Sequence, residues 1–386
     1  MNLVILTNII TPYRRYMYDE INRYILNNHG QFHVLVMAKE ESNRHWEYDE
    51  YKTHYTILLQ KKIIIDSIPS GYFSFDLKER LLELQPDILV AAGGYNMLPV
   101  IQAIFFRKRI KYKLLFWSES NLIGRETISI IKKINRSIIR YITYNCFDGF
   151  WNAGKLSDEF ISQYKKNGVP SFFMPNLVDI EFYKQALEFS KNSKSEIKKR
   201  YSLSETKKIL ICPARLSYEK GILEFLDLYP NIVHSSNAIL LLVGDGPLHT
   251  KIELKIRNIS LDIRLLGYKN QNEILQLYSI SDIFLLPSNI DPNPLSCIEA
   301  LHCGLPLLVS EHVGNFPEVI VKGKNGYVFS YKNKNDAISI IDNIIMKDDQ
   351  WFENARKESL QIANTIYNPQ NAIQHCITEM QNFFFN

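Results

Sequence analysis

The sequence predicts an α/β protein with two similar domains, and three observations lead to this fold class. Short apolar runs such as residues 3–6 and 86–91 alternate with longer stretches of helical character, which is typical of a parallel sheet wrapped by helices. A polar stretch after residue 180 interrupts the alternation, which then starts again. The length of 386 residues is sufficient for two such domains with complete cores.

The first predicted domain covers residues 1–180. A loop at residues 7–14 should lead from the first strand into a helix, and residues 77–84 should form another helix. The polar and aromatic segment 40–55 has the character of a long functional loop. The expected strands are residues 3–6, 32–37, 63–65, 86–91, 113–117 and 171–174.

The second predicted domain covers residues 181–365, and a polar helix at 179–201 connects it to the first. Residues 366–386 carry apolar side chains at helical spacing, and we expect this helix to pack back on the first domain. Two α/β domains of this kind predict a ligand cleft between them. The expected strands are residues 208–213, 238–243, 263–266, 283–286 and 305–309.

Composition argues against several classes of protein. Hydrophobic residues make up 46% of the chain, and the longest apolar runs are far shorter than a membrane span. Residues 1–7 lack the basic region and the cleavage site of a signal peptide, so we expect a strand there and a cytoplasmic location. The 5 scattered cysteines form no disulfide framework, and the 9 histidines show no paired spacing, so no metal site is expected.

The net charge of +4 is unevenly distributed, because basic residues concentrate in the segment 107–140. Only Glu119 and Glu126 oppose them, and isoleucines are interleaved. Two interpretations stay open: a basic amphipathic helix on an anionic membrane surface, or a solvated helix whose isoleucines face the domain core. The basic residues are Arg107, Lys108, Arg109, Lys111, Lys113, Arg125, Lys132, Lys133, Arg136 and Arg140.

A buried strand followed by a short helix brings polar residues together in the second domain. Asn293 is a good N-cap, Pro294 suits the first helical position, and Gly304 suits the position just after the helix. The first turn of a helix has unpaired amides, which favour a phosphate or a polarised sugar. A purely structural helix explains the caps, but it does not explain why Asp291 and Glu299 flank this turn.

The first strand of the second domain ends in a loop that carries Arg215 and Lys220. These two cations suit a diphosphate, because a guanidinium binds phosphate in bidentate fashion and an ammonium acts as a point charge. Taken alone, an exposed turn is the simpler interpretation of this loop. The glycine turn at Gly244 and Gly246 either lets a nucleotide approach the backbone or only makes a tight turn.

Taken in order, these motifs resemble the retaining GT-B glycosyltransferases of family 4. The resemblance covers the second domain densely, whereas the first domain matches only in its strand order. It implies two Rossmann-like domains facing a central cleft, with the acceptor bound by the first domain and the nucleotide-sugar donor by the second. The residues that carry it are Arg215, Lys220, Gly221, Val243, Gly244, Gly246, Pro247, Leu266, Gly267, Pro287, Ser288, Asp291, Glu299, Ala300, Gly304, Pro306, Gly314, Pro317, Glu318 and Val319, with Pro175, Asn176, Val178 and Asp179 between the domains.

The resemblance also implies roles for the donor site. Arg215 and Lys220 would hold the diphosphate and stabilise the charge on the leaving phosphate, while Asp291 would contact the transferred sugar and Glu299 the ribose. The sugar would keep its anomeric configuration and pass through an oxocarbenium-like transition state, without a protein nucleophile and without a metal. The other donor-side residues would be Gly244, Tyr268, Lys269, Asn293, Leu295 and Ser296, the last two through their amides.

The sequence departs from the family pattern in the donor motif. The first acidic residue is Asp291, where the family commonly has Glu, so its side chain reaches one methylene less far. Pro292 and Pro294 stand where glycines are frequent and remove two backbone donors. The identity of the donor sugar therefore cannot be carried over from the family.

The acceptor side departs from the pattern as well. Many family members have a histidine after a strand of the first domain, and Glu119 is the candidate substitute here. Arg14 stands in a loop that replaces the usual glycine-rich one, and three roles stay open for it: contact with the donor phosphate, contact with an acidic acceptor, or capping of the sheet. Tyr95 and Asn96 are the other acceptor-side candidates.

We therefore expect a glycosyltransferase that moves a sugar from a UDP- or GDP-linked donor to a glycan acceptor, with a lipid-linked acceptor in bacterial surface polysaccharide synthesis (O-antigen or capsule type) as the favoured case. No cofactor and no nucleic-acid partner are expected. Two other classes stay open on the same fold, a sugar-nucleotide epimerase and a non-catalytic carbohydrate-binding protein. Both fit the residues less well, because the Arg215 and Lys220 pair is suited to cleaving a donor diphosphate.

Overall fold

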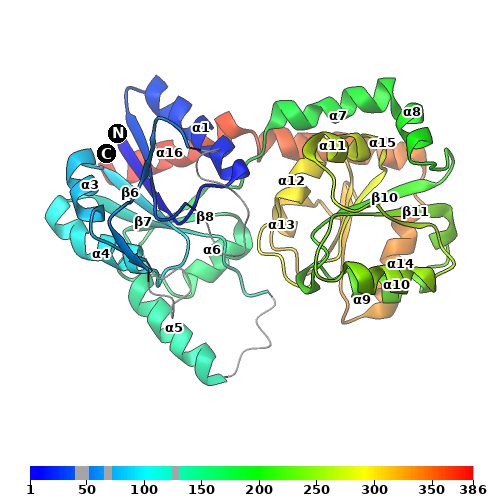
Figure 1. Cartoon of the computed structure of the whole chain (residues 1–386), viewed down its shortest axis with the longest axis horizontal. Helices are drawn as coiled ribbons and strands as arrows, with labels where there is room; N and C mark the ends of the chain where they lie inside the picture. Colours follow the sequence, from blue (N-terminus) through cyan, green and yellow to red (C-terminus); the bar gives the residue numbers. More distant parts are fainter. Residues whose placement is uncertain (40–51, 65–71, 124–129, 386) are drawn as a thin grey trace. The chain divides into compact units, whose positions relative to one another are not determined.

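The computed structural model describes residues 1–39, 52–64, 72–123 and 130–385. The chain divides into two compact units. Unit 1 consists of Met1–Leu177 together with Pro369–Asn386, and unit 2 is Val178–Asn368 (Figure 1). Most of the segment 40–55, which has the character of a functional loop in the sequence, lies outside the described residues.

Unit 1 is built on a seven-stranded parallel sheet with the order β3-β2-β1-β6-β7-β8-β9. Its central strands are buried on both faces, which is why they appear in the sequence as continuous apolar runs. The residues 62–64 instead form β4, which pairs antiparallel with β5 in a separate two-stranded sheet. The strands are β1 (Asn2–Thr7), β2 (Gln31–Val36), β3 (Thr56–Leu58), β4 (Lys62–Ile64), β5 (Tyr72–Ser74), β6 (Ile88–Ala92), β7 (Lys113–Ser118), β8 (Gly149–Asn152) and β9 (Ser171–Phe173).

Helices cover both faces of the unit 1 sheet, and alternate residues of β1 point to each side. Leu3 and Ile5 belong to the core cluster that includes residues of α1 and α16. Val4 and Leu6 belong to the cluster on the other face, which includes residues of α3, α4 and α6. The helices are α1 (Pro12–Asn27), α3 (Leu77–Leu84), α4 (Leu98–Ile110), α5 (Ile130–Tyr144), α6 (Lys155–Ser162) and α16 (Pro369–Phe385).

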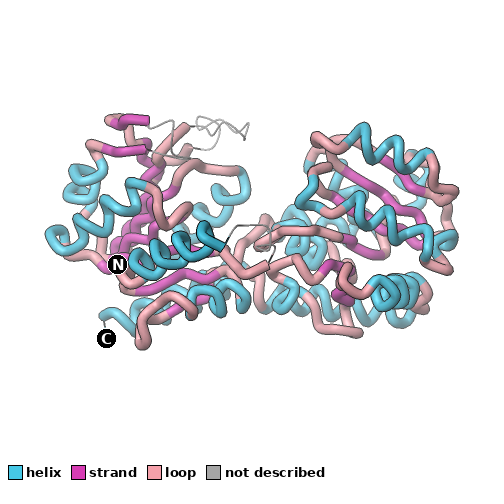
Figure 2. Tube along the Cα trace, turned by 90° about the horizontal axis from the view of Figure 1, so that it is seen from below, coloured by secondary structure: helices cyan, strands magenta, loops and turns pink. Residues whose placement is uncertain are grey.

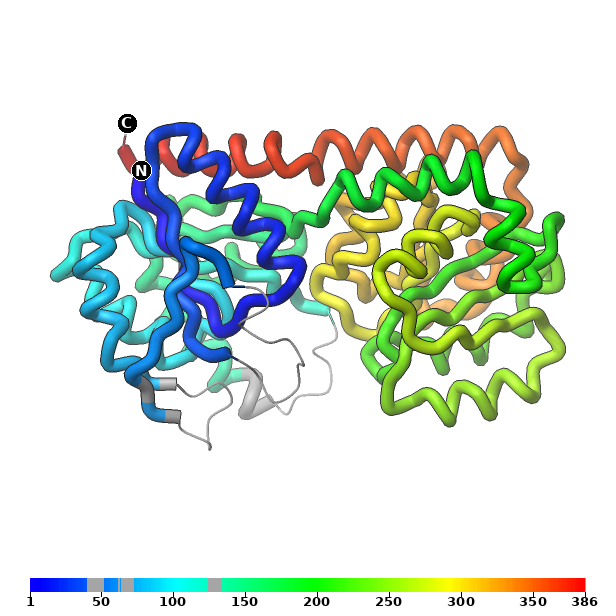
Figure 3. Tube along the Cα trace, turned by 45° about the horizontal axis from the view of Figure 1, so that its top comes forward, coloured from blue at the N-terminus to red at the C-terminus, as the bar shows by residue number. Residues whose placement is uncertain are grey.

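The last helix, α16, belongs to unit 1 and not to the unit that precedes it in the chain. Its buried side chains include Ile373, Ile377 and Met380, which pack with α1 and the sheet. Trp151 on β8 donates a hydrogen bond from Nε1 to the Met380 sulfur at 2.9 Å. Figure 3 shows α16, in red, running alongside α1.

Unit 2 contains a six-stranded parallel sheet with the order β12-β11-β10-β13-β14-β15. Ile209 and Ile211 of β10 pack against α7, α11 and α12, while Leu210 and Cys212 pack toward α9 and α14. Figure 2 shows the strands of this unit, in magenta, enclosed by helices. The strands are β10 (Lys208–Pro213), β11 (Ala238–Val243), β12 (Ile263–Leu265), β13 (Ile283–Leu286), β14 (Leu307–Ser310) and β15 (Gly326–Phe329).

The helices of unit 2 lie on both sides of this sheet. The single helix predicted for residues 179–201 is instead two helices, because the backbone of Ser193 leaves the helical region with φ −134°. The helices are α7 (Ile180–Asn192), α8 (Lys194–Arg200), α9 (Ile222–Leu228), α10 (His249–Arg257), α11 (Gln271–Ile280), α12 (Leu295–His302), α13 (Phe316–Val319), α14 (Lys334–Ile345) and α15 (Asp349–Thr365).

The strand orders show where each sheet offers a ligand site. In unit 2 the order reverses between β10 and β13, and in unit 1 it reverses between β1 and β6. At such a switch point the loops after neighbouring strands lead to opposite faces of the sheet and leave a crevice at the carboxyl edge. The predicted fold class, two parallel sheets wrapped by helices, is confirmed.

Candidate functional site

The loops that follow β10 and β13 meet at the switch point of unit 2. The amides of Asn289 and Ile290 donate to the carbonyl oxygen of Glu219 at 2.8 and 3.0 Å. Gly221 has φ +63°, and a Cβ at this position would lie 2.0 Å from the carbonyl oxygen of Pro287. Only glycine allows this approach, so the two loops are fixed against each other through their backbones.

Lys220 and Asp291, predicted as separate phosphate and sugar contacts, form an ion pair with 2.6 Å between Nζ and Oδ2. Lys220 ends a short 3-10 helix, and α9 begins two residues later at Ile222. The backbone of Asp291 is held by the carbonyl oxygen of His312 and the amide of Gly314. The pair is mostly buried, with side-chain exposures of 23% and 10%, so each charge orients the other.

Arg215 lies on the same loop and is exposed. Across the described residues, no hydrogen bond or ion pair engages its guanidinium group. The loop itself is held by the glycine turn after β11, since Leu216 donates its amide to the carbonyl oxygen of Asp245 at 3.0 Å. Gly244 has φ +140°, and a Cβ there would lie 2.2 Å from the Ala214 carbonyl oxygen. Gly244 therefore has a packing role in this turn.

The helix α12 begins at Leu295, with Pro294 and not Asn293 at the N-cap position. The predicted Asn293 cap is wrong, because Pro294 already has an extended backbone with ψ 127°. Asn293 instead accepts a hydrogen bond from Asn315 at 3.3 Å. No side chain caps the helix, so the amides of Leu295 and Ser296 stand in the first turn without an intrahelical acceptor.

The other end of α12 follows the prediction. Gly304 stands just after the helix with φ +72°, and the amide of Leu305 returns to the carbonyl oxygen of Ala300 at 2.9 Å. This is the left-handed ending for which glycine is favoured. The helix therefore has a fixed length, which sets the position of its first turn and of Glu299.

Glu299 lies in the middle of α12, and its Oε2 accepts a hydrogen bond from the Tyr278 hydroxyl at 3.0 Å. Burial raises the pKa of Glu299, and hydrogen bonds from Tyr183 and Tyr278 partly offset this effect. Burial and the Glu299 charge together raise the pKa of Tyr278. The two tyrosines come from α7 and α11 and hold the carboxylate in one orientation.

The loop after β12 carries Tyr268 and Lys269. The Tyr268 side chain is 77% exposed, so its ring is available at this edge of unit 2. Lys269 pairs with Glu273 at 3.1 Å at the start of α11. Asn270 caps the same helix in a reciprocal arrangement with Glu273, so Lys269 contributes to the local structure of this helix start.

Sequence reasoning missed three residues that support the donor motif. Asn315 is buried and donates to the Pro294 carbonyl oxygen at 3.0 Å, which fixes the entry to α12. Tyr183 and Tyr278 orient Glu299. A buried tyrosine on a helix has the same apolar periodicity as a core residue, whereas the position of Asn315 directly after Gly314 was an available signal.

In unit 1 the structure brings Arg14 and Glu119 together. Their side chains form an ion pair between the first turn of α1 and the end of β7. The Arg14 guanidinium also lies 3.9 Å from the centre of the Trp117 ring. The Arg14 side chain is only 17% exposed, so these contacts hold the cation in place at the carboxyl edge of the sheet.

Tyr95 and Asn96 follow β6, the other strand at the switch point of unit 1. Tyr95 packs inward, since its ring lies 5.9 Å from that of Tyr144 and 4.8 Å from the Arg140 guanidinium. Asn96 is exposed. Both candidates are therefore at the predicted edge, but only Asn96 presents its side chain to solvent.

The basic segment 107–140 is divided between structural and exposed residues. Arg107 pairs with Asp148 at 3.2 Å, and buried Arg140 lies against the rings of Tyr95, Phe160 and Tyr164. These two cations serve the fold, so the membrane-surface interpretation of the segment does not apply to them. Residues 124–129, with Arg125 and Glu126, lie outside the described residues.

The isoleucines of α5 test one of the two interpretations of this segment, the one in which they face the domain core. Ile134, Ile138 and Ile142 are 53%, 53% and 61% exposed, and Ile139 is 50% exposed. The interpretation in which they face the domain core is therefore wrong for these residues. Within the described parts of the chain, no helix combines the length and the apolar character that crossing a bilayer requires.

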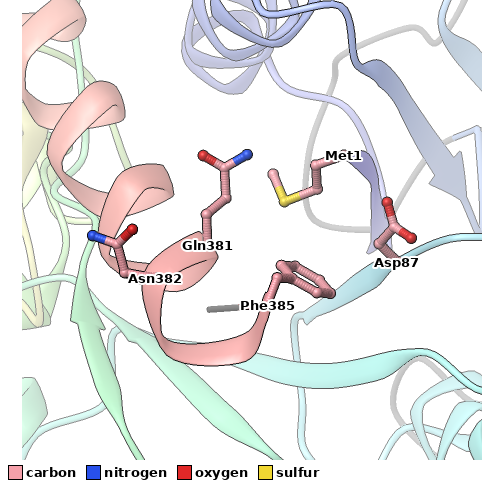
Figure 4. A pocket seen from close by; sticks show the side chains of 5 residues that line it. All are labelled: Met1, Asp87, Gln381, Asn382 and Phe385. Carbon is pink, nitrogen blue, oxygen red and sulfur yellow. The ribbon is translucent and has the colours of Figure 1, made fainter.

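A pocket that the sequence does not predict lies at the opposite edge of the unit 1 sheet. It has a volume of about 410 Å³ and is lined by residues that precede β1 and β6 and by the end of α16 (Figure 4). Asp87 accepts a hydrogen bond from the Asn2 amide at 2.7 Å, so its carboxylate is used in the sheet. The lining residues are Met1, Asp87, Gln381, Asn382 and Phe385.

No group of three or more histidine, cysteine or acidic side chains is arranged to hold a metal ion in the ranges that the structure describes. The charged groups at the unit 2 switch point include the cations Arg215 and Lys220 and the carboxylates Asp291 and Glu299. These side chains are suited to an anionic ligand with neighbouring hydroxyl groups.

Residues 193–358 match the family model of the glycosyl transferases group 1. N-acetyl-alpha-D-glucosaminyl L-malate synthase of Bacillus anthracis is 32% identical over 168 residues, which are 43% of each chain. UDP-Gal:alpha-D-GlcNAc-diphosphoundecaprenol alpha-1,3-galactosyltransferase of Escherichia coli is 27% identical over 52% of this chain and 50% of that protein. The chain thus spans about half the length of the curated relatives it matches.

The structure extends the similarity to the whole chain. The crystal structure of Anabaena Alr3699/HepE in complex with UDP superposes with a TM-score of 0.75 and 16% identity, over 99% of this chain and 100% of that one. At this identity the likeness shows the fold, which includes both parallel sheets. The family model and the shared fold agree: residues 193–358 match the group 1 glycosyltransferases, and the whole chain has the GT-B fold.

Proposed function

We propose that this protein is a retaining glycosyltransferase that moves a sugar from a UDP- or GDP-linked donor to a glycan acceptor. One observation carries the proposal: Arg215, Lys220 and the uncapped first turn of α12 come from loops that meet at the unit 2 switch point. Two cations beside free amides are suited to a diphosphate. A fold-stabilising role alone does not require an exposed guanidinium that makes no hydrogen bond or ion pair with the described residues.

The charges favour breaking the bond between the sugar and the diphosphate. As this bond breaks, negative charge grows on the leaving phosphate and positive charge grows on the sugar ring. The negative charge on the leaving phosphate would be stabilised by Lys220, by Arg215 and by the amides of Leu295 and Ser296. Asp291 would lie close to the positive charge on the sugar ring. Asp291 also fixes Lys220, so the ion pair gives the ammonium group a defined position before the donor binds.

The remaining donor-side residues would hold the nucleoside. Glu299, oriented by Tyr278, offers a carboxylate for the ribose hydroxyl groups. Tyr268 offers an exposed ring for the nucleobase. Gly244 and Asn293 contribute by shaping the loops, since each contacts neighbouring loop atoms.

Unit 1 would supply the acceptor side. Arg14 and Glu119 form one charged pair at the carboxyl edge of its sheet, and Asn96 is exposed at the switch point of the same edge. We propose that this pair positions the acceptor, with Glu119 near the reacting hydroxyl group. The acceptor we favour is a lipid-linked glycan of the surface-polysaccharide type, because a relative that matches about half of this chain is described as acting on a diphosphoundecaprenol-linked sugar.

A panel of nucleotide sugars tests the proposal. The purified protein is incubated with UDP- and GDP-linked hexoses and N-acetylhexosamines, and the products are separated by mass spectrometry and NMR. Transfer or slow hydrolysis with release of nucleoside diphosphate is expected. An epimerised donor would show an isomerase, and the absence of both turnover and nucleotide binding across the panel would show a protein without this activity.

A further inference from the structure

Tyr331 follows β15, the edge strand of the unit 2 sheet, and its hydroxyl group reaches the two loops that carry the proposed donor site. The hydroxyl oxygen lies 2.9 Å from the carbonyl oxygen of Pro287 and 3.2 Å from that of Gly221. Gly221 directly follows Lys220, and Pro287 begins the loop that leads to Asp291. A carbonyl oxygen can only accept, so the hydroxyl shares its single hydrogen between the two loops.

This contact crosses the sheet and is not a local one. Tyr331 is 110 positions from Gly221 and 44 positions from Pro287 in the chain. In the sheet, β15 is separated from β13 by β14, and β10 lies one strand further away. Pro287 is buried, and no other group among the described residues donates to its carbonyl oxygen. The Tyr331 hydroxyl therefore satisfies a buried acceptor and joins two distant loops at the same time.

The ring of Tyr331 is itself held by packing. It lies against the core cluster that contains Ile222 and Phe225 of α9, and it meets the Phe329 ring edge-on with 5.4 Å between the centroids. Burial raises the pKa of the Tyr331 hydroxyl well above its ordinary value, so the group stays protonated and can donate at neutral pH. A donor on a packed ring has little freedom to move, which suits it to fixing the position of other groups.

A second route ties the loop after β15 to the Asp291 loop. Ser330 donates a hydrogen bond from its hydroxyl to the Glu311 carboxylate at 2.7 Å. The residue after Glu311 is His312, whose carbonyl oxygen accepts the Asp291 amide at 3.1 Å. Together with the contacts of Tyr331, these bonds join the loops after the four neighbouring strands β10, β13, β14 and β15 into one network.

We propose that Tyr331 is a positioning residue for the transfer reaction: its hydroxyl holds the Lys220 loop against the Asp291 loop and so sets the position of the ammonium group. The inference rests on the proposed function, which assigns Lys220 to the leaving phosphate. A cation fixed before the donor binds acts on the charge that develops as the bond breaks. Loss of the hydroxyl should therefore slow the chemical step more than it weakens nucleotide binding, since Glu299 and Tyr268 stand outside this network.

Tyr331→Phe removes only the hydroxyl oxygen and tests the inference by kinetics. The kcat for donor turnover should fall about tenfold, while the Kd of UDP or GDP, measured by calorimetry, should change less than about twofold. Tyr229→Phe is the matched control, because the buried Tyr229 hydroxyl also donates to a backbone carbonyl oxygen of unit 2, that of Ser235 at 3.5 Å. This control should keep the wild-type kcat. An equal fall in kcat in both variants, or weaker binding with an unchanged kcat, would overturn the inference.

A double-mutant cycle shows whether Tyr331 acts through Lys220. In the Lys220→Ala background, Tyr331→Phe should lower kcat by less than about twofold, because the group that the hydroxyl positions is already gone. Losses that multiply in the double variant would mean that Tyr331 acts independently of this cation, which contradicts the proposed role.

Hydrogen–deuterium exchange tests the loop contact without any substrate. The amides of Asn289 and Ile290, which donate to the Glu219 carbonyl oxygen, should exchange at least about tenfold faster in Tyr331→Phe than in the wild type or in Tyr229→Phe. Equal exchange in all three proteins would refute the role of the hydroxyl. If the wild-type protein turns over no donor, the proposed function fails, and the exchange rates still decide whether Tyr331 holds the two loops together.

Discussion

The ammonium group of Lys220 lies 2.6 Å from Oδ2 of Asp291, although the two residues are 71 positions apart in the chain. Strand β10 and strand β13 are neighbours in the sheet, and this pairing brings their following loops together. The ion pair therefore joins the diphosphate side of the proposed donor site to its sugar side. A substitution at either residue should therefore affect both the diphosphate side and the sugar side of the site.

Lys220→Ala should lower kcat/KM for sugar transfer about a hundredfold, because the charge on the leaving phosphate loses a fixed cation. The fold should be kept, since Lys220 lies at a loop and its side chain is partly exposed. Steady-state kinetics measures the loss in kcat/KM, and circular dichroism checks that the fold is kept. Lys251→Ala, at an exposed lysine on α10, is the matched control and should leave the rate unchanged. Wild-type turnover in Lys220→Ala would refute the phosphate role.

Asp291→Asn should reduce transfer and also lower the free energy of unfolding by about 1–2 kcal/mol. Asparagine keeps the shape, but Lys220 loses a charged partner in a largely buried site. The double variant Asp291→Asn/Lys220→Met should recover much of the stability and none of the activity. Urea denaturation followed by tryptophan fluorescence measures the stability. A double variant that is less stable than either single one would contradict the coupling.

Gly221→Ala should destabilise unit 2 by about 2 kcal/mol or more, because a left-handed residue with a Cβ meets the Pro287 carbonyl oxygen. The shift of the 287–294 loop should also weaken donor binding. Gly323→Ala is the control: it has φ +81°, and its nearest neighbour, the Tyr327 hydroxyl, is 3.9 Å away, so it carries the backbone strain without the clash. Equal losses in both variants would show that contact with Pro287 is unimportant.

Arg14→Ala and Glu119→Gln should each raise the KM for the acceptor, and the double variant should be little worse than either single one. This non-additivity is expected because the pair acts as a unit, with Glu119 orienting the Arg14 guanidinium over Trp117. Arg15 and Asp19 form an ion pair on the same helix at 2.9 Å. Arg15→Ala therefore controls for loss of a helix ion pair and should leave acceptor kinetics unchanged. Additive effects at Arg14 and Glu119 would argue for separate roles.

His302 should make stability depend on pH. Burial lowers the pKa of His302 from 6.5 to about 4, so the unfolded chain binds more protons between these values. The free energy of unfolding should fall as the pH falls through this window, by at most about 3 kcal/mol from this residue. In His302→Leu the free energy of unfolding should decrease less over the same pH window, because the contribution of His302 is absent. Denaturation curves at several pH values from 4 to 7 compare the two proteins, and parallel profiles would contradict the assignment.

The sequence predicts most strands of the two large sheets and the C-terminal end of α12, because long apolar runs and Gly304 have few alternatives, but it misses β3, β8 and β15. It also places Arg215, Lys220, Asp291 and Glu299 at strand ends or on one short helix. The Lys220–Asp291 pairing depends on which strands are neighbours, and apolar periodicity does not contain that information. The strand order has to be known first.

Two other features depend on tertiary packing in the same way. The periodicity of α5 shows that an apolar face exists, but burial of Arg140 and Tyr144 decides that this face points outward. The Asn293 cap was predicted from residue preference, while the chain enters α12 through Pro294 and uses Asn315 to hold the turn. The N-cap preference of a residue type concerns a single position, whereas the residue that becomes the N-cap of α12 depends on the path of the whole loop.

Unit 1 is completed by residues 369–386, which follow unit 2 in the sequence and therefore leave the ribosome after it. The core of unit 1 beside α1 is filled by Ile373, Cys376, Ile377 and Met380. Residues 1–177 therefore expose an apolar surface while unit 2 is being synthesised. Unit 2 is continuous and can fold as soon as its own chain has emerged. Biosynthesis should therefore finish the second unit first, and the nascent first unit is the part that a chaperone would need to protect.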